Sequence, residues 1–336
     1  MMLVTMSESS SQASSQNSLA SLAFPMARAA GAALNLPAQL CQRLRDAQRL
    51  GPLMIPGATN ALAAKQIEQA GFQSVYVSGA GLANSAAGYP DIGLLTLSEV
   101  AFLGGLIARS TNLPTIIDAD TGFGEAVQVY RTVQLLEQEG LSGLHLEDQV
   151  FPKRCGHLDG KQVIRPEAMA QKLRAACAAR QNPDFLIIAR TDAYSLNGMA
   201  DALERARLYL DAGAQMIFPE ALATEAEFAE FARELYKTHP KALLLANMTE
   251  FGKSALIPAE RLGAMGYQAV IYPLTLMRAV LTTQAELLAE LKASGTQQPW
   301  VARMTTRKAL YDLLAYPAYA AFDATLGGYF KPQGPA

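Results

Sequence analysis

Cysteine, histidine and tryptophan are scarce in this sequence of 336 residues, which contains 3, 3 and 1 of them respectively. The cysteines stand at positions 41, 155 and 177, and they form neither a CxxC pair nor the framework of a secreted disulfide-rich domain. This pattern indicates a reducing compartment, and we infer the cytoplasm.

Long apolar runs and an excess of one charge are also lacking. No window approaches 18 uncharged apolar residues, and the apolar patch at 19–34 follows a Ser-rich, acid-containing start. The 28 basic side chains nearly balance the 30 acidic ones, so electrostatics favour neither nucleic acid nor an anionic membrane as a partner. We therefore expect no signal peptide, no nucleic-acid or membrane partner, and a small molecule as the ligand.

Eight short apolar or β-branched runs are present, and each is followed by a helix-like segment. Runs that are apolar throughout suit strands buried on both faces, as in a parallel sheet with crossover helices. Eight such units predict a (β/α)8 TIM-type barrel over residues 39–295. An open doubly wound sheet is the alternative, but its GxGxxG turn is missing after the first strand. The runs begin at Pro52, Gln73, Pro114, Ser142, Asp184, Ala214, Ala242 and Ala269.

The segments outside this repeat have different compositions. Residues 1–38 are rich in Ser, Ala and Gln, which predicts a mobile extension without chemistry, and 36–49 has the pattern of an amphipathic helix. Residues 296–336 have a helical pattern with Trp300 and many other aromatic residues. We expect these C-terminal helices either to make oligomer contacts or to pack back on their own barrel.

Polar side chains cluster where the predicted strands end. In a barrel these ends converge on one mouth, where active sites are built from several loops. Contact with solvent alone accounts for one or two polar strand ends, but not for several carboxylates and an arginine within apolar runs. The residues are Ser78, Gly79, Asp118, Asp120, Glu147, Arg190, Asp192, Glu220 and Asn247.

Asp118 and Asp120 are two residues apart, so both carboxylates can face the mouth. Glu147 and Asp148 end the next strand and are expected to add negative charge nearby. Clustered carboxylates need a cation, and ligands that are all oxygen suit Mg2+, or Mn2+, better than zinc. A metal site is therefore predicted, with acids that merely face solvent as the alternative.

Cys155 lies in the sequence KRCGH, beside Lys153, Arg154 and His157. Nearby cations favour the thiolate and lower the pKa of the thiol towards neutrality, where it can exchange protons. This pattern predicts a catalytic acid or base, and the alternative is a surface turn with a buried structural cysteine. His145, inside the fourth strand, is expected to be a packed core histidine.

Nine motifs occur in order over residues 50–315 and together resemble the isocitrate lyase and phosphoenolpyruvate mutase superfamily. KRCGH discriminates best, because the lyases that it resembles carry the cysteine and the mutases do not. The motifs are VYVSGAG, YPDIG, IDADTGFG, GLHLEDQ, KRCGH, ARTDA, FPEA, LANMTEFG and YPLT.

The resemblance implies a retro-aldol lyase that works without a covalent intermediate, here cleaving 2-methylisocitrate to pyruvate and succinate. By family position, Asp118, Asp120 and Glu147 would hold Mg2+, which would chelate the substrate's hydroxyl and carboxylate. Cys155 would protonate the leaving succinate carbanion, and Asp91 and Arg190 match active-site positions. The group that removes the hydroxyl proton stays open between Tyr76 and a metal-bound water.

The resemblance also implies a set of substrate-binding residues. Ser78, Gly79 and Ala80 would hold the pyruvate carboxylate, although this chain reads SGAG where SGGG is more usual. The tail LDGK after His157 resembles oxaloacetate hydrolases and 2,3-dimethylmalate lyases, which are alternative activities, as is a carboxylate-binding barrel without turnover. A homotetramer with exchanged C-terminal helices is implied too. The remaining binding positions are Tyr76, Gly156, His157, Arg190, Phe218, Glu220, Asn247, Thr249, Pro273 and Leu274.

Overall fold

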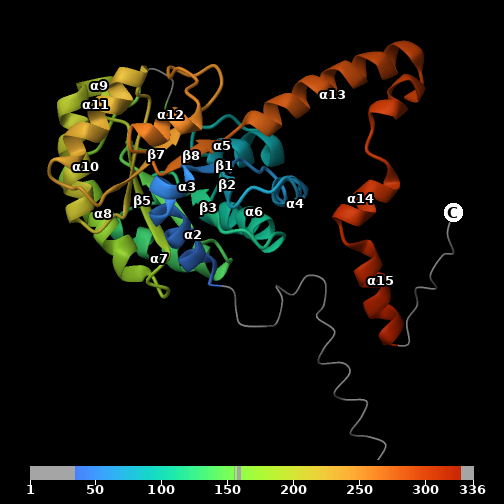
Figure 1. Cartoon of the computed structure of the whole chain (residues 1–336), viewed down its shortest axis with the longest axis horizontal. Coiled ribbons are helices and arrows are strands. Elements are labelled where there is room, and N and C mark those ends of the chain that lie inside the picture. Colours follow the sequence, from blue (N-terminus) through green and yellow to red (C-terminus); the bar gives the residue numbers. More distant parts are fainter. Residues whose placement is uncertain (1–34, 155, 157–159, 327–336) are drawn as a thin grey trace, which may run out of the picture. The chain divides into compact units, whose positions relative to one another are not determined.

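The computed structural model describes residues 35–154, 156 and 160–326, and within them eight parallel strands form a barrel (Figure 1). From β2 to β8 each strand pairs with the next along the chain, and β8 also pairs with β1. A parallel bridge between Gly57 and Tyr76 joins β1 to β2 and closes the ring. The predicted (β/α)8 barrel is confirmed, and all eight predicted runs contain a strand. The strands are β1 (Leu53–Pro56), β2 (Val75–Val77), β3 (Thr115–Asp118), β4 (Gly143–Glu147), β5 (Leu186–Thr191), β6 (Met216–Pro219), β7 (Leu243–Asn247) and β8 (Ala269–Tyr272).

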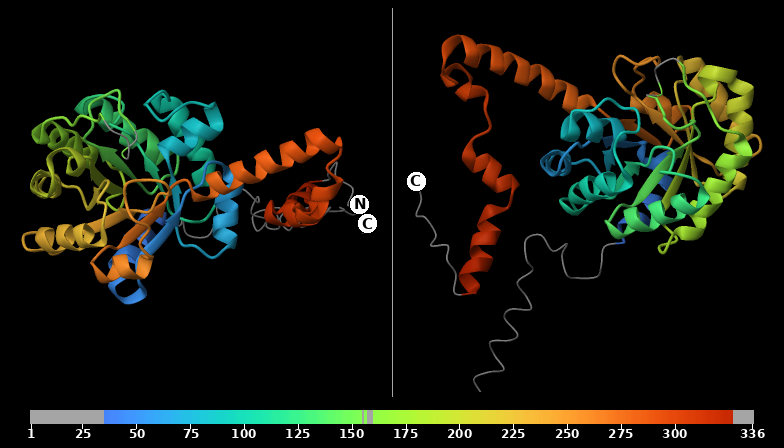
Figure 2. Two further views of the ribbon diagram at one scale, coloured as in Figure 1. Left: turned by 90° about the horizontal axis from the view of Figure 1, so that it is seen from above. Right: turned by 180° about the vertical axis from the view of Figure 1, so that it is seen from behind.

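Helices follow the strands and surround them, as two further views show (Figure 2). The helices up to β8 are α2 (Leu36–Arg45), α3 (Ala47–Leu50), α4 (Ala61–Gln69), α5 (Gly79–Leu82), the π-helix η1 (Ala83–Ala87), α6 (Leu97–Arg109), α7 (Ala126–Gln138), α8 (Pro166–Ala179), α9 (Tyr194–Asn197), α10 (Met199–Asp211), α11 (Glu225–Tyr236) and α12 (Ala259–Ala264). After β8 come α13 (Thr275–Ser294), the 3-10 helix η2 (Gln298–Arg303), α14 (Arg307–Leu313) and α15 (Tyr316–Thr325).

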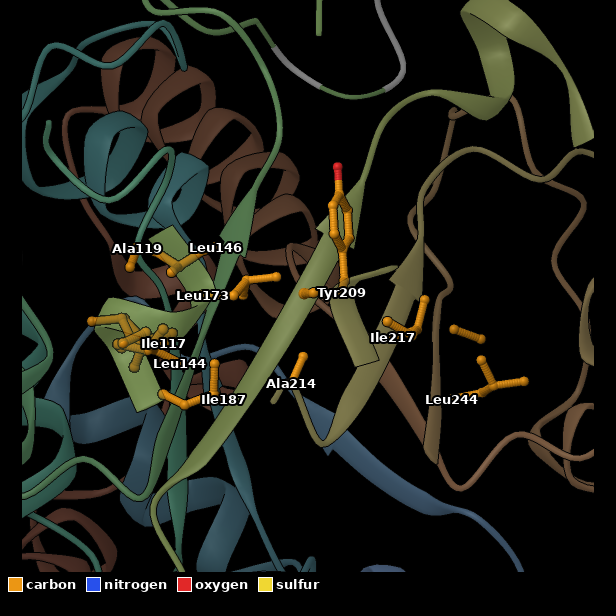
Figure 3. Packing of buried hydrophobic residues seen from close by; sticks show 14 of the residues in the cluster. Ile117, Ala119, Leu144, Leu146, Leu173, Ile187, Tyr209, Ala214, Ile217 and Leu244 are labelled. Atoms are coloured by element: carbon orange, nitrogen blue, oxygen red, sulfur yellow. The ribbon is translucent and has the colours of Figure 1, made fainter. Parts of the chain in front are cut away.

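Side chains alternate along each strand between the barrel interior and the layer under the helices. Ile117, Ile187 and Ile217 face outward and are fully buried in one cluster with Leu173 of α8 and Tyr209 of α10 (Figure 3). The residues before or after them on the same strands belong to a second cluster, inside the barrel. The polar residues that end the strands continue the inward set, which is why they reach the mouth.

Helix α2 contributes Leu40 and Leu44 to the inner cluster. These leucines join Leu53 and Leu186, which are the first residues of β1 and β5. The predicted amphipathic helix therefore covers the amino-terminal ends of the strands, opposite the polar mouth. Its start is fixed by Asn35, whose side chain accepts a hydrogen bond from the amide of Ala38, and by Pro37 in the first turn.

The chain divides into two compact units, one comprising residues 35–300 and the other having 301–326 as its described part. Helices α13, α14 and α15 contain no buried residue. No helix in the described part of the chain is long and apolar enough to cross a membrane. The predicted extension lies outside the described residues as far as residue 34, and the division into 1–38, 39–295 and 296–336 stays a prediction.

Candidate active site

Thirteen predicted residues line one cavity of about 60 Å³ at the carboxyl ends of the strands, and every described residue that lines it was predicted. Sites that hold small ligands usually measure about 300–1,000 Å³, so this cavity is small by comparison. The lining residues are Tyr76, Ser78, Ala80, Asp91, Asp118, Gly156, Arg190, Phe218, Glu220, Asn247, Thr249, Pro273 and Leu274. Gly79, Asp120 and Glu147 adjoin these residues through contacts described below, and Cys155 and His157 lie outside the described residues.

Two larger cavities differ from this one in position and chemistry. A cavity of about 500 Å³ near Cys41 and Leu243 lies at the amino-terminal ends of the strands and has no carboxylate in its lining. Another, of about 780 Å³, borders Asp120 from the side of Phe123 and Gln149. Because Asp118, Glu220 and Arg190 line the small cavity together, we regard it as the candidate active site.

Asp118 and Asp120 are held beside the backbone of Gly79. The amide of Asp120 donates to Oδ1 of Asp118 over 2.9 Å, and the amide of Gly79 donates to Oδ2 over 3.3 Å. A Cβ atom on Gly79 would lie 3.0 Å from Oδ2 of Asp118 and 3.3 Å from Oδ1 of Asp120. Oxygens of both carboxylates therefore lie beside one point, the position that a Cβ atom of residue 79 would occupy. This point stays clear because residue 79 is a glycine.

Lys153 bridges Asp91 and Asp120, which lie in two different loops. Its Nζ lies 2.8 Å from Oδ1 of Asp120, it pairs with Asp91, and its side chain is 3% exposed. The sequence had placed this lysine only among the cations near Cys155. Burial would lower the pKa of Lys153, but Asp120, Glu147 and the other acids outweigh burial and raise it well above its usual value. Lys153 is thus a buried cation that neutralises part of the acidic cluster.

Asp120 and Glu147 are the acids at the mouth that are costly to ionise. Burial raises the pKa of Asp120 to about 6 although Lys153 opposes this shift, and burial raises the pKa of Glu147 well above its usual value. Neither carboxylate oxygen of Glu147 accepts a hydrogen bond within the described part of the chain. Arg190 approaches this carboxylate from β5, with its Nε 3.4 Å from Oε2. The Glu147 oxygens are available to a further cation or to bound water.

Arg190 projects into the mouth from β5 and contacts three acids. Its Nε and Nη2 donate to Asp192 over 2.9 and 3.2 Å, and its Nη1 lies 3.6 Å from Glu220. The guanidinium also lies 5.2 Å from the centre of the Phe218 ring. A rigid, charged fork at a cavity wall suits a carboxylate ligand.

Asp148 was expected beside the acidic cluster, and this prediction is wrong. Its carboxylate faces the layer under the helices, where Oδ2 accepts hydrogen bonds from Thr191, Tyr209 and Arg205, and Oδ1 accepts from the amide of Asp192. The two-residue alternation accounts for the difference: Glu147 faces inward, so its neighbour faces outward. Asp148 therefore fixes the end of β5 instead of adding charge to the mouth.

His145 is a packed core residue, as expected. It is fully buried, its Nε2 lies 2.9 Å from the hydroxyl of Tyr76, and its ring packs edge-on against Phe218. Burial lowers the pKa of His145 below its usual value. Tyr76 lines the cavity, and the buried His145 ring lies behind its hydroxyl.

The part of the cavity wall that follows β6, β7 and β8 combines amide and apolar groups. Nδ2 of Asn247 lies 3.3 Å from a carboxylate oxygen of Glu220. Pro273 lies against the end of β1, where a Cβ atom on Gly57 would be 2.0 Å from the Pro273 carbonyl oxygen. Phe218 and Leu274 complete an apolar side of the cavity.

The described residues do not by themselves complete a metal centre, since no three His, Cys, Asp or Glu side chains in this part converge as a ligand set. The two aspartates that flank one point, and the unbonded oxygens of Glu147, still fit a hard cation that keeps several waters. A Mg2+ ion is such a cation, whereas a dedicated protein cage would require more direct ligands.

Comparison with known proteins places this chain in a family. A model of the phosphoenolpyruvate phosphomutase family matches residues 43–292. Probable 2-methylisocitrate lyase 1 of Corynebacterium glutamicum is 53% identical over 279 residues, which cover 83% of this chain and 90% of that protein. The chain belongs to the phosphoenolpyruvate mutase and isocitrate lyase superfamily. It is an enzyme of the lyase class.

Further members of the superfamily agree with this assignment. The 2-methylisocitrate lyase of Aeropyrum pernix is 47% identical over 272 residues, which cover 81% of this chain and 86% of that protein. A crystal structure of 2,3-dimethylmalate lyase matches with a TM-score of 0.81 and 31% identity over 90% of this chain and 98% of that one. A phosphonopyruvate hydrolase in complex with oxalate and Mg++ matches with a TM-score of 0.74 and 31% identity over 84% and 97%.

Proposed function

We propose that this protein is a Mg2+-dependent carbon-carbon lyase that cleaves 2-methylisocitrate to pyruvate and succinate in the methylcitrate cycle of propionate catabolism. The main observation in support is the buried meeting of Asp118, Asp120 and Glu147 with Arg190 at the mouth of a barrel whose relatives are lyases. Together these groups suit a metal-held hydroxy acid with more than one carboxylate.

The relatives' names and the apolar wall support this choice of substrate. Both relatives from Corynebacterium glutamicum and Aeropyrum pernix bear the name 2-methylisocitrate lyase. Phe218, Pro273 and Leu274 offer an apolar surface to a methyl group. One methyl group contributes only about 1–3 kcal/mol of discrimination, so related acids are expected to be poorer substrates that are not excluded. 2,3-Dimethylmalate cleavage is the second candidate, favoured by the structural match to that lyase.

Asp118 and Asp120 would hold the metal, with Glu147 acting directly or through water. Bound Mg2+ would supply a Lewis acid that lowers the pKa of the substrate hydroxyl and stabilises the alkoxide oxygen, which becomes the keto oxygen of pyruvate. The pKa of Asp120, about 6, and the unbonded oxygens of Glu147 support a cation at this point. Mn2+ is expected to substitute, because it accepts the same oxygen ligands.

The protein's own groups would orient the substrate and move one proton. Arg190 would bind a substrate carboxylate through its planar fork, and Glu220 and Asn247 would line the same wall. Breaking the carbon-carbon bond leaves its electron pair on the succinate carbon, which the thiol of Cys155 would protonate, as the KRCGH resemblance implies. The proton of the hydroxyl would leave to a base at the mouth, and Tyr76 and a metal-bound water both stay candidates.

We also propose that the protein is a cytoplasmic homotetramer in which residues 296–336 form an oligomerisation segment with exchanged helices. Met54 of β1 is 44% exposed although its neighbours Leu53 and Ile55 are buried inside the barrel. At Met54 the outer face of β1 therefore lacks the cover that Ile117 or Leu244 receives. Helix α13 follows β8 but buries none of its residues, so the same helix of another subunit would cover this face.

A substrate comparison tests the proposed activity. Initial rates of product release are measured with Mg2+ present for four acids. Pyruvate is assayed from 2-methylisocitrate and 2,3-dimethylmalate, glyoxylate from isocitrate, and oxalate from oxaloacetate, with an independent assay for the second product in each case. The largest kcat/KM is expected for 2-methylisocitrate. A larger value for 2,3-dimethylmalate would transfer the assignment to that acid. Absence of turnover with all four would contradict the lyase proposal.

A further inference from the structure

Lys161 is a buried lysine that the predicted mechanism does not use. Its side chain is 1% exposed, and its Nζ donates to Oδ1 of Asp192 over 2.8 Å and to the backbone carbonyl of Gly156 over 2.5 Å. Charged side chains are rarely buried this deeply unless a specific partner needs them. The partners here are one strand-end acid and one backbone carbonyl in the KRCGH sequence.

Asp192 connects this lysine to the guanidinium at the mouth. Its two oxygens accept from Nε and Nη2 of Arg190 while Oδ1 also accepts from Lys161. Burial would raise the pKa of Asp192, but attraction to Arg190 and Lys161 outweighs burial and holds it below its usual value. The backbone is fixed as well, because the amide of Asp192 donates to Asp148. The Asp192 carboxylate thus fixes the positions of the Arg190 guanidinium and the Lys161 ammonium relative to each other.

Gly156 lies directly against the group that Asp192 orients. A Cβ atom on Gly156 would lie 2.4 Å from Nη2 of Arg190 and 2.6 Å from Cγ of Glu220. The Gly156 backbone therefore lies close against the guanidinium and the Glu220 side chain, and these groups leave no room for a side chain at position 156. Lys161 bonds to both sides of this contact, through the Gly156 carbonyl on one side and through Asp192 on the other.

We propose that Lys161 is a positioning residue for the reaction, setting the Gly156 backbone against Arg190 through its bridge to Asp192. It does not line the cavity at the mouth, so it acts through these partners and not on the substrate. The inference rests on the proposed lyase function for its kinetic consequence. Its structural part, the restraint on Gly156, holds for any substrate.

Replacement of Lys161 by methionine tests the kinetic part, because methionine keeps length and apolar contact but removes the ammonium. We expect kcat for 2-methylisocitrate to fall about 10- to 100-fold, as for loss of a charged hydrogen bond, with KM changed less than about threefold. KM is expected to persist because Arg190 keeps both of its bonds to Asp192. Lys161→Arg, which keeps the cation, should restore part of the lost kcat. Equal losses in both variants, or a loss confined to KM, would overturn the proposal.

A double-mutant cycle with Asp192→Asn tests the route of the effect. The change in log kcat that Lys161→Met causes is compared in two backgrounds. If Lys161 acts through Asp192, this change should be less than half as large in the Asp192→Asn background as in the wild type. Fully additive losses would contradict the bridge.

Arg180→Met is the matched control. Arg180 lies at the other end of β5, where it bonds the carbonyls of Pro183 and Phe185 and the side chain of Gln215. Its loss should lower the free energy of unfolding and leave kcat unchanged. If Arg180→Met lowers kcat as much as Lys161→Met does, the kinetic effect reflects general destabilisation and the proposal fails.

Amide hydrogen exchange separates this inference from the proposed function, because it needs no turnover. In the peptide that spans Gly156, exchange should be at least about tenfold faster in Lys161→Met than in the wild type, and unchanged in Arg180→Met. Unchanged exchange in Lys161→Met would overturn the inference. Faster exchange in Lys161→Met, combined with a wild-type protein that cleaves none of the four acids, would support the inference and reject the lyase proposal. If Lys161→Met does not fold, the Lys161→Gln variant serves for both measurements.

Discussion

At the scale of single residues, direction matters as much as identity. Glu147 and Asp148 are adjacent acids at the end of β4, yet one faces the mouth and the other binds Tyr209 and Arg205 outside the strands. The sequence held the signal for this difference in its two-residue alternation. It held no signal that Lys153 would pair with Asp120, because that contact depends on the path of a loop.

We predict that Asp118→Asn and Asp148→Asn have opposite consequences. Asp118→Asn should weaken Mg2+ binding and lower kcat by more than the 10- to 100-fold typical of losing a partner in a metal's outer shell. Asp148→Asn should leave Mg2+ affinity within about threefold of the wild type but lower the free energy of unfolding by about 1–3 kcal/mol, since buried donors lose their acceptor. Calorimetric titration and urea unfolding measure the two quantities, and equal metal affinities in the two variants would contradict the assignment.

Gly156→Ala tests how closely the backbone approaches Arg190. The added Cβ would lie 2.4 Å from Nη2, so either the backbone or the guanidinium must shift. We expect kcat to fall at least about tenfold while the melting temperature changes by less than about 2 °C. Steady-state kinetics and calorimetry decide, and wild-type kcat in this variant would show that the close contact is absent in the working enzyme.

At the scale of elements, apolar runs and caps determined most of what could be predicted. All eight strands fall within the predicted runs, because a short run that is apolar throughout and recurs before each helical segment is typical of a strand buried on both faces. Helix starts follow local chemistry: Thr224 and Glu227 form a reciprocal capping box at the start of α11. The bond from Lys161 to Asp192 could not be predicted, since the two residues stand 31 positions apart and their segments meet only in the closed barrel.

The cap of α11 gives a pH-dependent prediction. Burial would raise the pKa of Glu227, but hydrogen bonds from Tyr194, Thr224 and Ala223 outweigh burial and lower it. A carboxylate with a lowered folded-state pKa stabilises above its unfolded pKa, about 4.3, and loses this contribution as pH falls through the folded value. Glu227→Gln should therefore lower the free energy of unfolding by about 0.5 kcal/mol at pH 7 and by less below pH 4. Urea unfolding at both pH values measures the difference, and an equal loss at both would contradict the charged cap.

At the scale of the whole molecule, the barrel leaves Met54 of β1 exposed and fully buries no residue of α13. Exposed apolar side chains of α13 include Leu276, Val280, Leu281, Leu288 and Leu291. Sequence composition could indicate that the tail needs a partner surface, but not whether that surface belongs to the same chain. Which surface covers the tail depends on which distant residues the folded barrel leaves exposed, and Met54 is the most informative of these.

Charge introduced on this apolar surface should disrupt the proposed homotetramer. Light scattering after size exclusion is expected to show a smaller species for the double variant Leu281→Lys, Leu288→Lys, because lysines at a buried interface are costly to desolvate. Leu50→Lys is the control: Leu50 is 50% exposed on α3 and should leave the mass unchanged. A wild-type protein that elutes as a monomer, or a double variant that keeps the full assembly, would contradict helix exchange.

The most direct test of the central claim is the metal dependence of pyruvate release from 2-methylisocitrate. The protein is freed of metal with a chelator, and initial rates are recorded without added ion, with Mg2+ and with Mn2+. We predict no detectable release without an ion, restored release with Mg2+, and partial release with Mn2+, since the clustered acids at the mouth serve a hard cation. An equal rate before and after metal removal, or no pyruvate at any metal concentration, would contradict the proposal.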